Sequence, residues 1–158
     1  MEMPPTQRPA VVVSEHAIQL EFIGVKEVIF RASRPPISIP RESINGPQYN
    51  LGRADYDAEQ KRIQVFSKVE FATSDPKEFT FSVELVGQFV INEESFPSNL
   101  VEDWADRAAM YIILPYLREH VYSLSLRIGV NPPLMLPLLQ LPKYTITAAQ
   151  SEPQMATA

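Results

Sequence analysis

The chain contains no cysteine. This absence excludes disulfide bonds, metal sites built on thiolates and a cysteine nucleophile. Disulfides are rare in reducing compartments, so the composition is consistent with such a compartment without requiring it.

Histidine is nearly as scarce, with His16 and His120 the two in the chain. Two histidines so far apart in the sequence predict neither a metal site nor a general base. A Gly-x-Ser-x-Gly nucleophile elbow and a phosphate-binding glycine loop are also absent. Paired carboxylates such as Glu93 and Glu94 lie in turn-like stretches, where we expect them to be solvated. The sequence therefore predicts no enzymatic activity, no metal and no cofactor.

Basic clusters and long apolar runs are missing as well. The net charge is −5 without a basic patch, and nucleic-acid binding requires clustered Lys and Arg, so no nucleic-acid partner is expected. No uninterrupted apolar run approaches 18 residues, so no membrane insertion is expected. The N-terminus lacks the basic and apolar regions of a signal peptide. We expect a soluble, cytoplasmic protein.

Glycine is sparse and proline abundant, with 5 and 15 residues respectively among 158. A chain of this length is expected to form one domain. The prolines gather near the N-terminus, in an expected long loop over 35–47, and in a segment over 132–142. Together with the polar, alanine-rich end, they predict a disordered arm over 1–15, a folded domain over 16–146 and a disordered tail over 147–158.

Four stretches have the composition and alternation of β-strands. The first runs over 18–30 with a bend or bulge at Gly24, and a weaker one follows over 48–56. Strict alternation over 63–71 and 79–89, with turn residues between them, predicts a hairpin. One polar face per strand is typical of an antiparallel sheet with one side in water.

A long helix is expected over 99–128. Asn99 and Glu102 have the spacing of a capping box, and Gly129 is a candidate left-handed stop. Pro115 lies in the middle, so the helix must be held by packing and is expected to bend there. Apolar residues form two stripes around it. One stripe can cover the sheet, and the second predicts self-association unless the C-terminal segment covers it. The expected interface residues are Tyr111, Leu114, Leu117, Val121 and Leu124.

The long loop and the segment after the helix carry isolated large aliphatic residues. A loop of this length is uncommon in a compact domain unless it lines a site. Apolar pockets beside spare backbone groups suit extended polypeptide segments. The alternative is that these side chains complete the core. The candidate binding residues are Ile37, Ile39, Ile44, Tyr49, Phe89, Leu134, Leu136 and Leu138.

The order and local sequence of these elements resemble the SecB export chaperone family over nearly the whole expected domain. The most specific match is Leu114-Pro115-Tyr116-Leu117-Arg118-Glu119, which is similar to the family's Phe-Pro-Tyr-Ala-Arg-Glu. Further matches in register are Val28 to Ser33, Asn45 to Leu51, Gly87 to Ile91, and Arg127, Gly129, Pro132, Leu134, Leu136 and Pro137. The resemblance implies an α+β fold in which a four-stranded antiparallel sheet packs on a long helix. It also implies a homotetramer, a dimer of dimers, that holds unfolded precursor proteins in apolar grooves without ATP.

The sequence departs from the family pattern in two places. Pro142 and the β-branched residues after it oppose the family's second helix, which we expect to be missing or replaced by a short strand. Glu27 matches one acidic position that the resemblance implies for docking on the SecA motor. Arg31 and Ser82 stand where further acids are expected, and charge reversal weakens docking. Holding of clients is therefore expected to carry over better than delivery to SecA.

Three functions remain open at this point. The first is a SecB-like holdase that keeps unfolded or precursor polypeptides competent for translocation. The second is a SecB-like chaperone dedicated to one client, such as the antitoxin of a toxin–antitoxin system. The third is a small-ligand-binding or enzymatic α+β domain, which the lack of catalytic groups disfavours.

Overall fold

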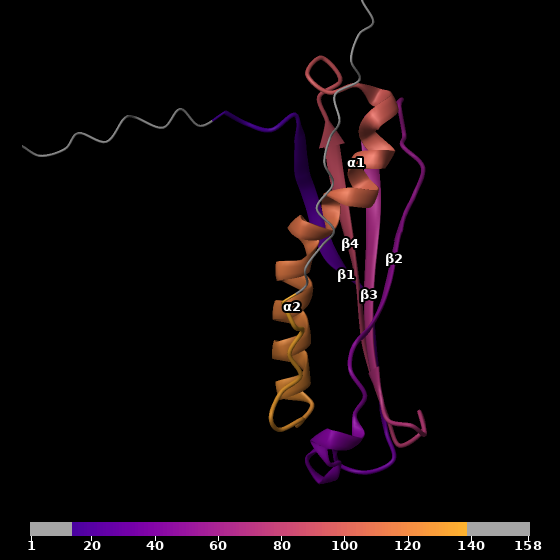
Figure 1. The fold of residues 1–158 in the computed structure, drawn as a ribbon, viewed down its shortest axis with the longest axis vertical. Coiled ribbons are helices and arrows are strands. Elements are labelled where there is room, and N and C mark those ends of the chain that lie inside the picture. The colour runs from indigo at the N-terminus through magenta and orange to yellow at the C-terminus, as the bar shows by residue number, and fades with distance from the viewer. Residues whose placement is uncertain (1–13, 139–158) are drawn as a thin grey trace, which may run out of the picture.

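The computed structural model describes residues 14–138. They form one four-stranded antiparallel sheet in the order β1-β4-β3-β2, with two helices packed on one face (Figure 1). The elements are β1 (Ile18–Ala32), β2 (Gln48–Arg53), β3 (Arg62–Ala72), β4 (Phe79–Ile91), α1 (Val101–Arg107) and α2 (Ala109–Arg127). The predicted fold class is confirmed. The expected arm, tail and missing second helix concern residues 1–13 and 139–158, which lie outside the described residues.

The alternation of β3 and β4 produces the core. Phe71, Phe79, Phe81 and Phe89 are fully buried on the face that the helices cover, whereas the polar residues between them point to the other face. The predicted hairpin joins the two strands. Its turn is held by Asp75, whose backbone oxygen accepts a hydrogen bond from the Thr73 hydroxyl at 2.6 Å. These central strands have neighbours on both sides, so they carry most of the buried aromatic surface.

Strand β1 is irregular on both sides of Gly24, not at it. Its pairing with β4 shifts between Leu20 and Phe22 and again between Val25 and Glu27, while Gly24 stays in register with Val86. The Phe22 ring lies over Gly24, where an added Cβ would meet the ring at 2.6 Å. The glycine is thus needed for close approach of an aromatic ring, and the prediction that it marks the bulge itself is wrong.

The single long helix that the sequence predicts is interrupted at Ala108, and Pro115 lies inside α2. The backbone tightens at the break, where the Tyr111 N–H donates to the Ala108 carbonyl at 3.1 Å. Helix α1 packs on β2 and β3, whereas α2 packs on β3 and β4. The two helices share β3, and each also packs on one further strand. The break at Ala108 was not expected, and a bend at Pro115 stays a prediction. The stop at Gly129, with φ +89°, is confirmed.

Glu102 does not form the predicted capping box with Asn99. A short 3-10 turn precedes α1, and no side chain caps the helix. Glu102 instead accepts the Tyr56 N–H at 3.1 Å and pairs with Arg53 at 3.2 Å. Its carboxylate ties α1 to the end of β2, because the ion pair with Arg53 adds to the Tyr56 N–H, whereas the cap would offer a neutral N–H alone.

The loop between β1 and β2 contains a repeated pentapeptide, Pro-x-x-Ser-Ile, at 35–39 and again at 40–44. Each copy forms a 3-10 turn in which the serine hydroxyl donates to the proline carbonyl at 2.7 Å. The isoleucine that ends each turn enters the core, so Ile39 and Ile44 are 5% and 6% exposed, whereas Ile37 is 70% exposed. The turns therefore act as two adjacent anchors for the loop.

The burial of these isoleucines predicts unequal costs of truncation. Ile39→Ala and Ile44→Ala should each lower the free energy of unfolding by about 2–4 kcal/mol, because each leaves a cavity. Ile37→Ala is the matched control and should cost less than about 0.5 kcal/mol. Urea unfolding followed by circular dichroism would measure all three. Equal costs for Ile37 and Ile39 would contradict the anchoring role of the turns.

Candidate functional site

The structure divides the predicted binding residues into a buried and an exposed group. Within the chain, Ile39, Ile44, Phe89, Leu134 and Leu136 belong to the core. For Ile39 and Ile44 the alternative, that the side chains complete the core, is confirmed, because the 3-10 turns direct them inward. Ile37 is exposed, Leu138 is 87% exposed, and Tyr49 is partly buried. The exposed members lie in the loop between β1 and β2 and in the segment after α2.

Three segments far apart in sequence meet beside Tyr49. The Arg118 guanidinium of α2 donates through Nη2 to the Pro137 carbonyl at 3.1 Å. Burial raises the pKa of the Tyr49 phenol, and the nearby Arg118 charge partly offsets this. The Tyr49 hydroxyl and Arg118 Nε are both buried without a hydrogen-bond partner in the described part of the chain. Two buried polar groups at this place thus have no protein partner among the described residues.

Among the described residues, strand β2 has an unpaired outer edge next to this junction. The Ala54 N–H donates to the Gln64 carbonyl. With the register of the two strands, this bond shows that the backbone groups of Gln48, Asn50 and Gly52 are the ones that pair with β3. In an antiparallel pair alternate residues turn their backbone groups outward, so Tyr49, Leu51 and Arg53 present theirs to the free edge. Leu51 lies opposite buried Ser67, on the face of the sheet that the helices cover, and is 49% exposed. The edge combines free backbone groups with apolar side chains.

The outward face of α2 differs from the predicted interface. Leu114, Leu117 and Val121 pack into the core of their own chain, and Leu124 is partly buried; of the expected residues, Tyr111 is exposed. The stripe that turns outward is the other one. We call the α2 outer stripe the set Tyr111, Ile112, Tyr116, Tyr122 and Leu126. Both stripes are apolar, so the hydrophobic pattern alone did not indicate which one faces the sheet.

A second apolar surface lies on β1. Val25, Val28 and Phe30 pair with core residues of β4 and therefore project from the helix-covered face, yet they are exposed. We call them the β1 row. Between β1 and the helix break, a cavity of about 410 Å³ is lined by His16, Ile18, Gln19, Leu20, Trp104, Ala108, Tyr111 and Ile112. The sheet edge on this side is therefore incompletely covered.

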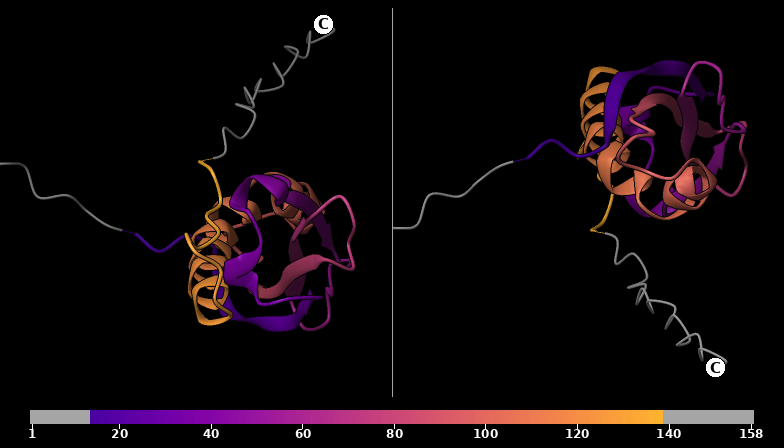
Figure 2. Two further views of the ribbon diagram at one scale, coloured as in Figure 1. Left: turned by 90° about the horizontal axis from the view of Figure 1, so that it is seen from below. Right: turned by 90° about the horizontal axis from the view of Figure 1, so that it is seen from above.

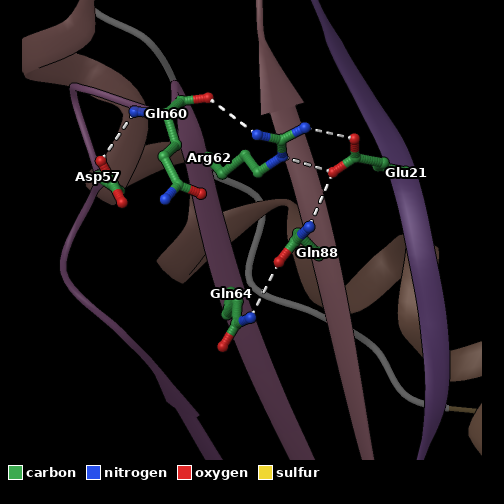
Figure 3. Close-up of polar contacts among 6 residues, drawn as sticks. All are labelled: Glu21, Asp57, Gln60, Arg62, Gln64 and Gln88. Carbon is green, nitrogen blue, oxygen red and sulfur yellow. Dashed lines mark hydrogen bonds and ion pairs between the residues drawn. The ribbon is translucent and has the colours of Figure 1, made fainter.

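The opposite face of the sheet is polar and charge-compensated. Arg62 donates two hydrogen bonds to Glu21, each 2.7 Å long, and Gln88 donates a third of 2.8 Å from the neighbouring strand (Figure 3). Hydrogen bonds from Arg62, and secondarily from Gln88, lower the pKa of Glu21 to about 2. Glu27, the predicted motor-docking residue, lies 3.9 Å from Lys68. Among the described residues, Glu27 therefore has a lysine beside it.

The described residues provide little for catalysis. No group of three or more metal-ligating side chains occurs within 14–138. His16 accepts the Ile18 N–H and stacks on Trp104, and His120 lies 3.6 Å from exposed Glu119. Neither histidine faces a potential nucleophile in these contacts. Within the same residues, no helix is long and apolar enough to cross a membrane.

The Glu21–Arg62 contact predicts a specific acid sensitivity. Because the folded-state pKa is lowered, the contact stabilises the fold above pH 4.5 and is lost as the pH falls from 4.5 to about 2. Arg62→Met should make the free energy of unfolding less dependent on pH in this window. Lys68→Met is the control on the same face. Urea unfolding at several pH values would test this, and equal pH dependence of the wild type and Arg62→Met would contradict it.

Comparison with known proteins identifies a similar fold. The Mycobacterium tuberculosis Rv1957 SecB-like chaperone, solved in complex with a ChAD peptide from the Rv1956 HigA1 antitoxin, matches with a TM-score of 0.60 at 20% identity over 78% of this chain and 88% of that chain. A Streptococcus agalactiae protein of unknown function matches with a TM-score of 0.40 at 17% identity over 77% and 97%. No protein-family model and no curated protein match the sequence. The chain thus has a fold like that of a SecB-like chaperone.

Proposed function

We propose that this protein is an ATP-independent chaperone that binds unfolded or precursor polypeptides and prevents their association. The observation that carries this proposal is the exposed apolar surface on the helix side of the sheet. It comprises the α2 outer stripe, the β1 row and the β2 edge around Leu51. Large exposed apolar patches on a folded domain are typical of interaction sites. The fold of the Rv1957 SecB-like chaperone supports the same function.

The β2 edge is the best candidate for client binding. Its outward backbone groups can pair with an extended chain, whatever the sequence of that chain. Leu51 and Ile37 are exposed, and Tyr49 is partly buried, so apolar client side chains can pack beside the backbone. Each fully buried apolar side chain contributes roughly 1.5–3 kcal/mol, and ordering of the client opposes this. Several such positions must therefore act together.

The α2 outer stripe and the β1 row are better suited to self-association. They lie on regular elements, and the stripe contains three tyrosines, which are enriched in protein interfaces. A second copy could cover both surfaces at once, and a tetramer would leave the β2 edges for clients. A mass near that of one 17.9 kDa chain, measured by light scattering at micromolar concentration, would contradict this assembly.

A chaperone dedicated to one client is the alternative. Two observations favour it: Glu27 lies close to Lys68, and the similar M. tuberculosis protein was solved with an antitoxin peptide. A general export role would instead require delivery to SecA from the cytoplasm. Binding assays with SecA and with an antitoxin encoded beside this chain would separate the two roles. Tight binding to SecA through Glu27 would favour export.

The function predicts that the protein suppresses aggregation of an unfolded enzyme, such as citrate synthase during heating, without nucleotide. The double variant Ile37→Ser with Leu51→Ser should reduce suppression several-fold while the fold is retained, since both side chains are exposed. Phe22→Ser is the matched control because Phe22 is equally large and exposed but lies at Gln88 on the polar face.

Light scattering of the heated enzyme would measure suppression. No suppression by the wild-type protein would contradict the chaperone function. Suppression that is equal in the wild type and the double variant would instead exclude the β2 edge as the client site.

A further inference from the structure

The β2 edge is the more regular of the two free edges of the sheet. Bulges interrupt β1 between Leu20 and Phe22 and between Val25 and Glu27. The pairing of β2 with β3 is continuous over Gln48–Arg53. Bulged edges resist the addition of a further strand, whereas continuous ones favour it. An additional strand is therefore accommodated more readily at β2 than along the first half of β1.

The chain itself leads toward this edge after α2. Leu134 is anchored by a hydrogen bond from its N–H to the Ser125 hydroxyl, and Pro137 by the bond from Arg118. Arg118 is close enough to Tyr49 of β2 to influence the pKa of its phenol. The two views in Figure 2 show this gold segment beside α2 on the side away from β1. Pro137 is thus held by a residue of α2 that lies near Tyr49 of β2.

Unsatisfied donors mark the same place. The Tyr49 hydroxyl, the Ser67 hydroxyl and Arg118 Nε are buried without hydrogen-bond partners among the described residues. Ser67 lies directly opposite Leu51, and Tyr49 is on the edge strand itself. Ser67 lies on β3, one strand inside the edge, so a strand added to β2 would not reach its hydroxyl. Tyr49 is on the edge strand and Arg118 lies near it, so these are the two donors that an added segment would lie beside.

The sequence after Leu138 contains a short segment with the composition of a strand. Tyr144-Thr145-Ile146-Thr147 alternates a large apolar residue with threonine, and all four residues favour β-structure. Five residues, 139–143, separate it from Leu138. At about 3.3 Å per residue, the six steps from Leu138 to Tyr144 span up to roughly 20 Å. A connection of this length lets the segment turn back and lie along a neighbouring strand, and Arg118, which holds Pro137, lies near Tyr49 of β2.

We propose that Tyr144–Thr147 adds to the free edge of β2 as a fifth strand of the chain's own sheet. Pairing of this segment with β2 does not depend on the chaperone function. Its consequence rests on that function: the segment occupies the edge at which a client would bind, so the chain competes with its clients. A tethered segment has an effective concentration in the millimolar range, and weak pairing is then enough for such competition.

The absence of cysteine allows a direct test of the pairing in the full chain. Leu51→Cys combined with Ile146→Cys should form a disulfide within one chain under mild oxidation. Phe22→Cys combined with Ile146→Cys is the control and should not, because Phe22 is on the opposite face. Mass spectrometry under denaturing conditions distinguishes the products. No disulfide, or a disulfide between chains only, would overturn the proposal that a chain's own segment binds there.

The competition is tested separately with full-length point variants. Ile146→Pro removes a backbone N–H and should prevent pairing, whereas Ala149→Pro lies beyond the segment. The affinity for reduced, carboxymethylated α-lactalbumin, measured by fluorescence anisotropy, should rise about three- to tenfold for Ile146→Pro and stay unchanged for Ala149→Pro. Equal affinities would overturn the competition. If neither variant nor the wild type binds this probe, the chaperone function fails, and the disulfide result still decides whether the segment pairs with β2.

Discussion

One helix layer cannot cover a four-stranded sheet, and the remaining features of this molecule follow from that mismatch. A helix with its side chains is about 10 Å wide, and strands lie about 4.8 Å apart, so one helix covers roughly two strands. Helix α2 lies on β4 and β3, approaching so closely that a Cβ on Gly87 would meet Ile113. The central strands are therefore buried, and the edge strands depend on other cover.

The chain covers its edges only in part. The isoleucine anchors of the β1–β2 loop and the leucines after α2 fill the core near one end of the sheet. The break at Ala108 lets α1 cover the ends of β2 and β3, where Arg53 holds Asp106 at 2.8 Å. Val25, Val28, Phe30 and Leu51 remain exposed on the same face. Apolar surface left in this way is available to a second copy or to an unfolded chain, which is the physical basis of the proposed function.

The sequence predicted what local periodicity determines. Strands β3 and β4 alternate strictly, and their hairpin was predicted because turn residues stand between them. The helix break was not predicted, because no glycine or proline stands next to Ala108. The break goes with the packing of the two helices on different pairs of strands. Glu102 left its expected cap because Arg53 and the Tyr56 N–H offered a charged, tertiary alternative. Arg53 and Tyr56 are both far from Glu102 in the sequence, so local sequence could not indicate these contacts.

For the candidate site, the sequence identified the segments but not the orientation of the side chains. The repeated Pro-x-x-Ser-Ile pattern was the available signal that Ile39 and Ile44 are equivalent and that Ile37 differs from them. The sequence could not predict which stripe of α2 faces outward, because buried Leu117 and exposed Tyr116 are both apolar. The β2 edge depends on strand order, which emerges only when the sheet is assembled.

Calorimetric titration of the protein with an unfolded polypeptide at several temperatures tests the central claim most directly. Burial of apolar surface on binding produces a negative heat-capacity change. The account predicts binding of the unfolded form, no binding of the native form of the same polypeptide, and a clearly negative heat-capacity change in the absence of nucleotide. Binding without a heat-capacity change and with strong salt dependence, or no binding at all, would contradict it.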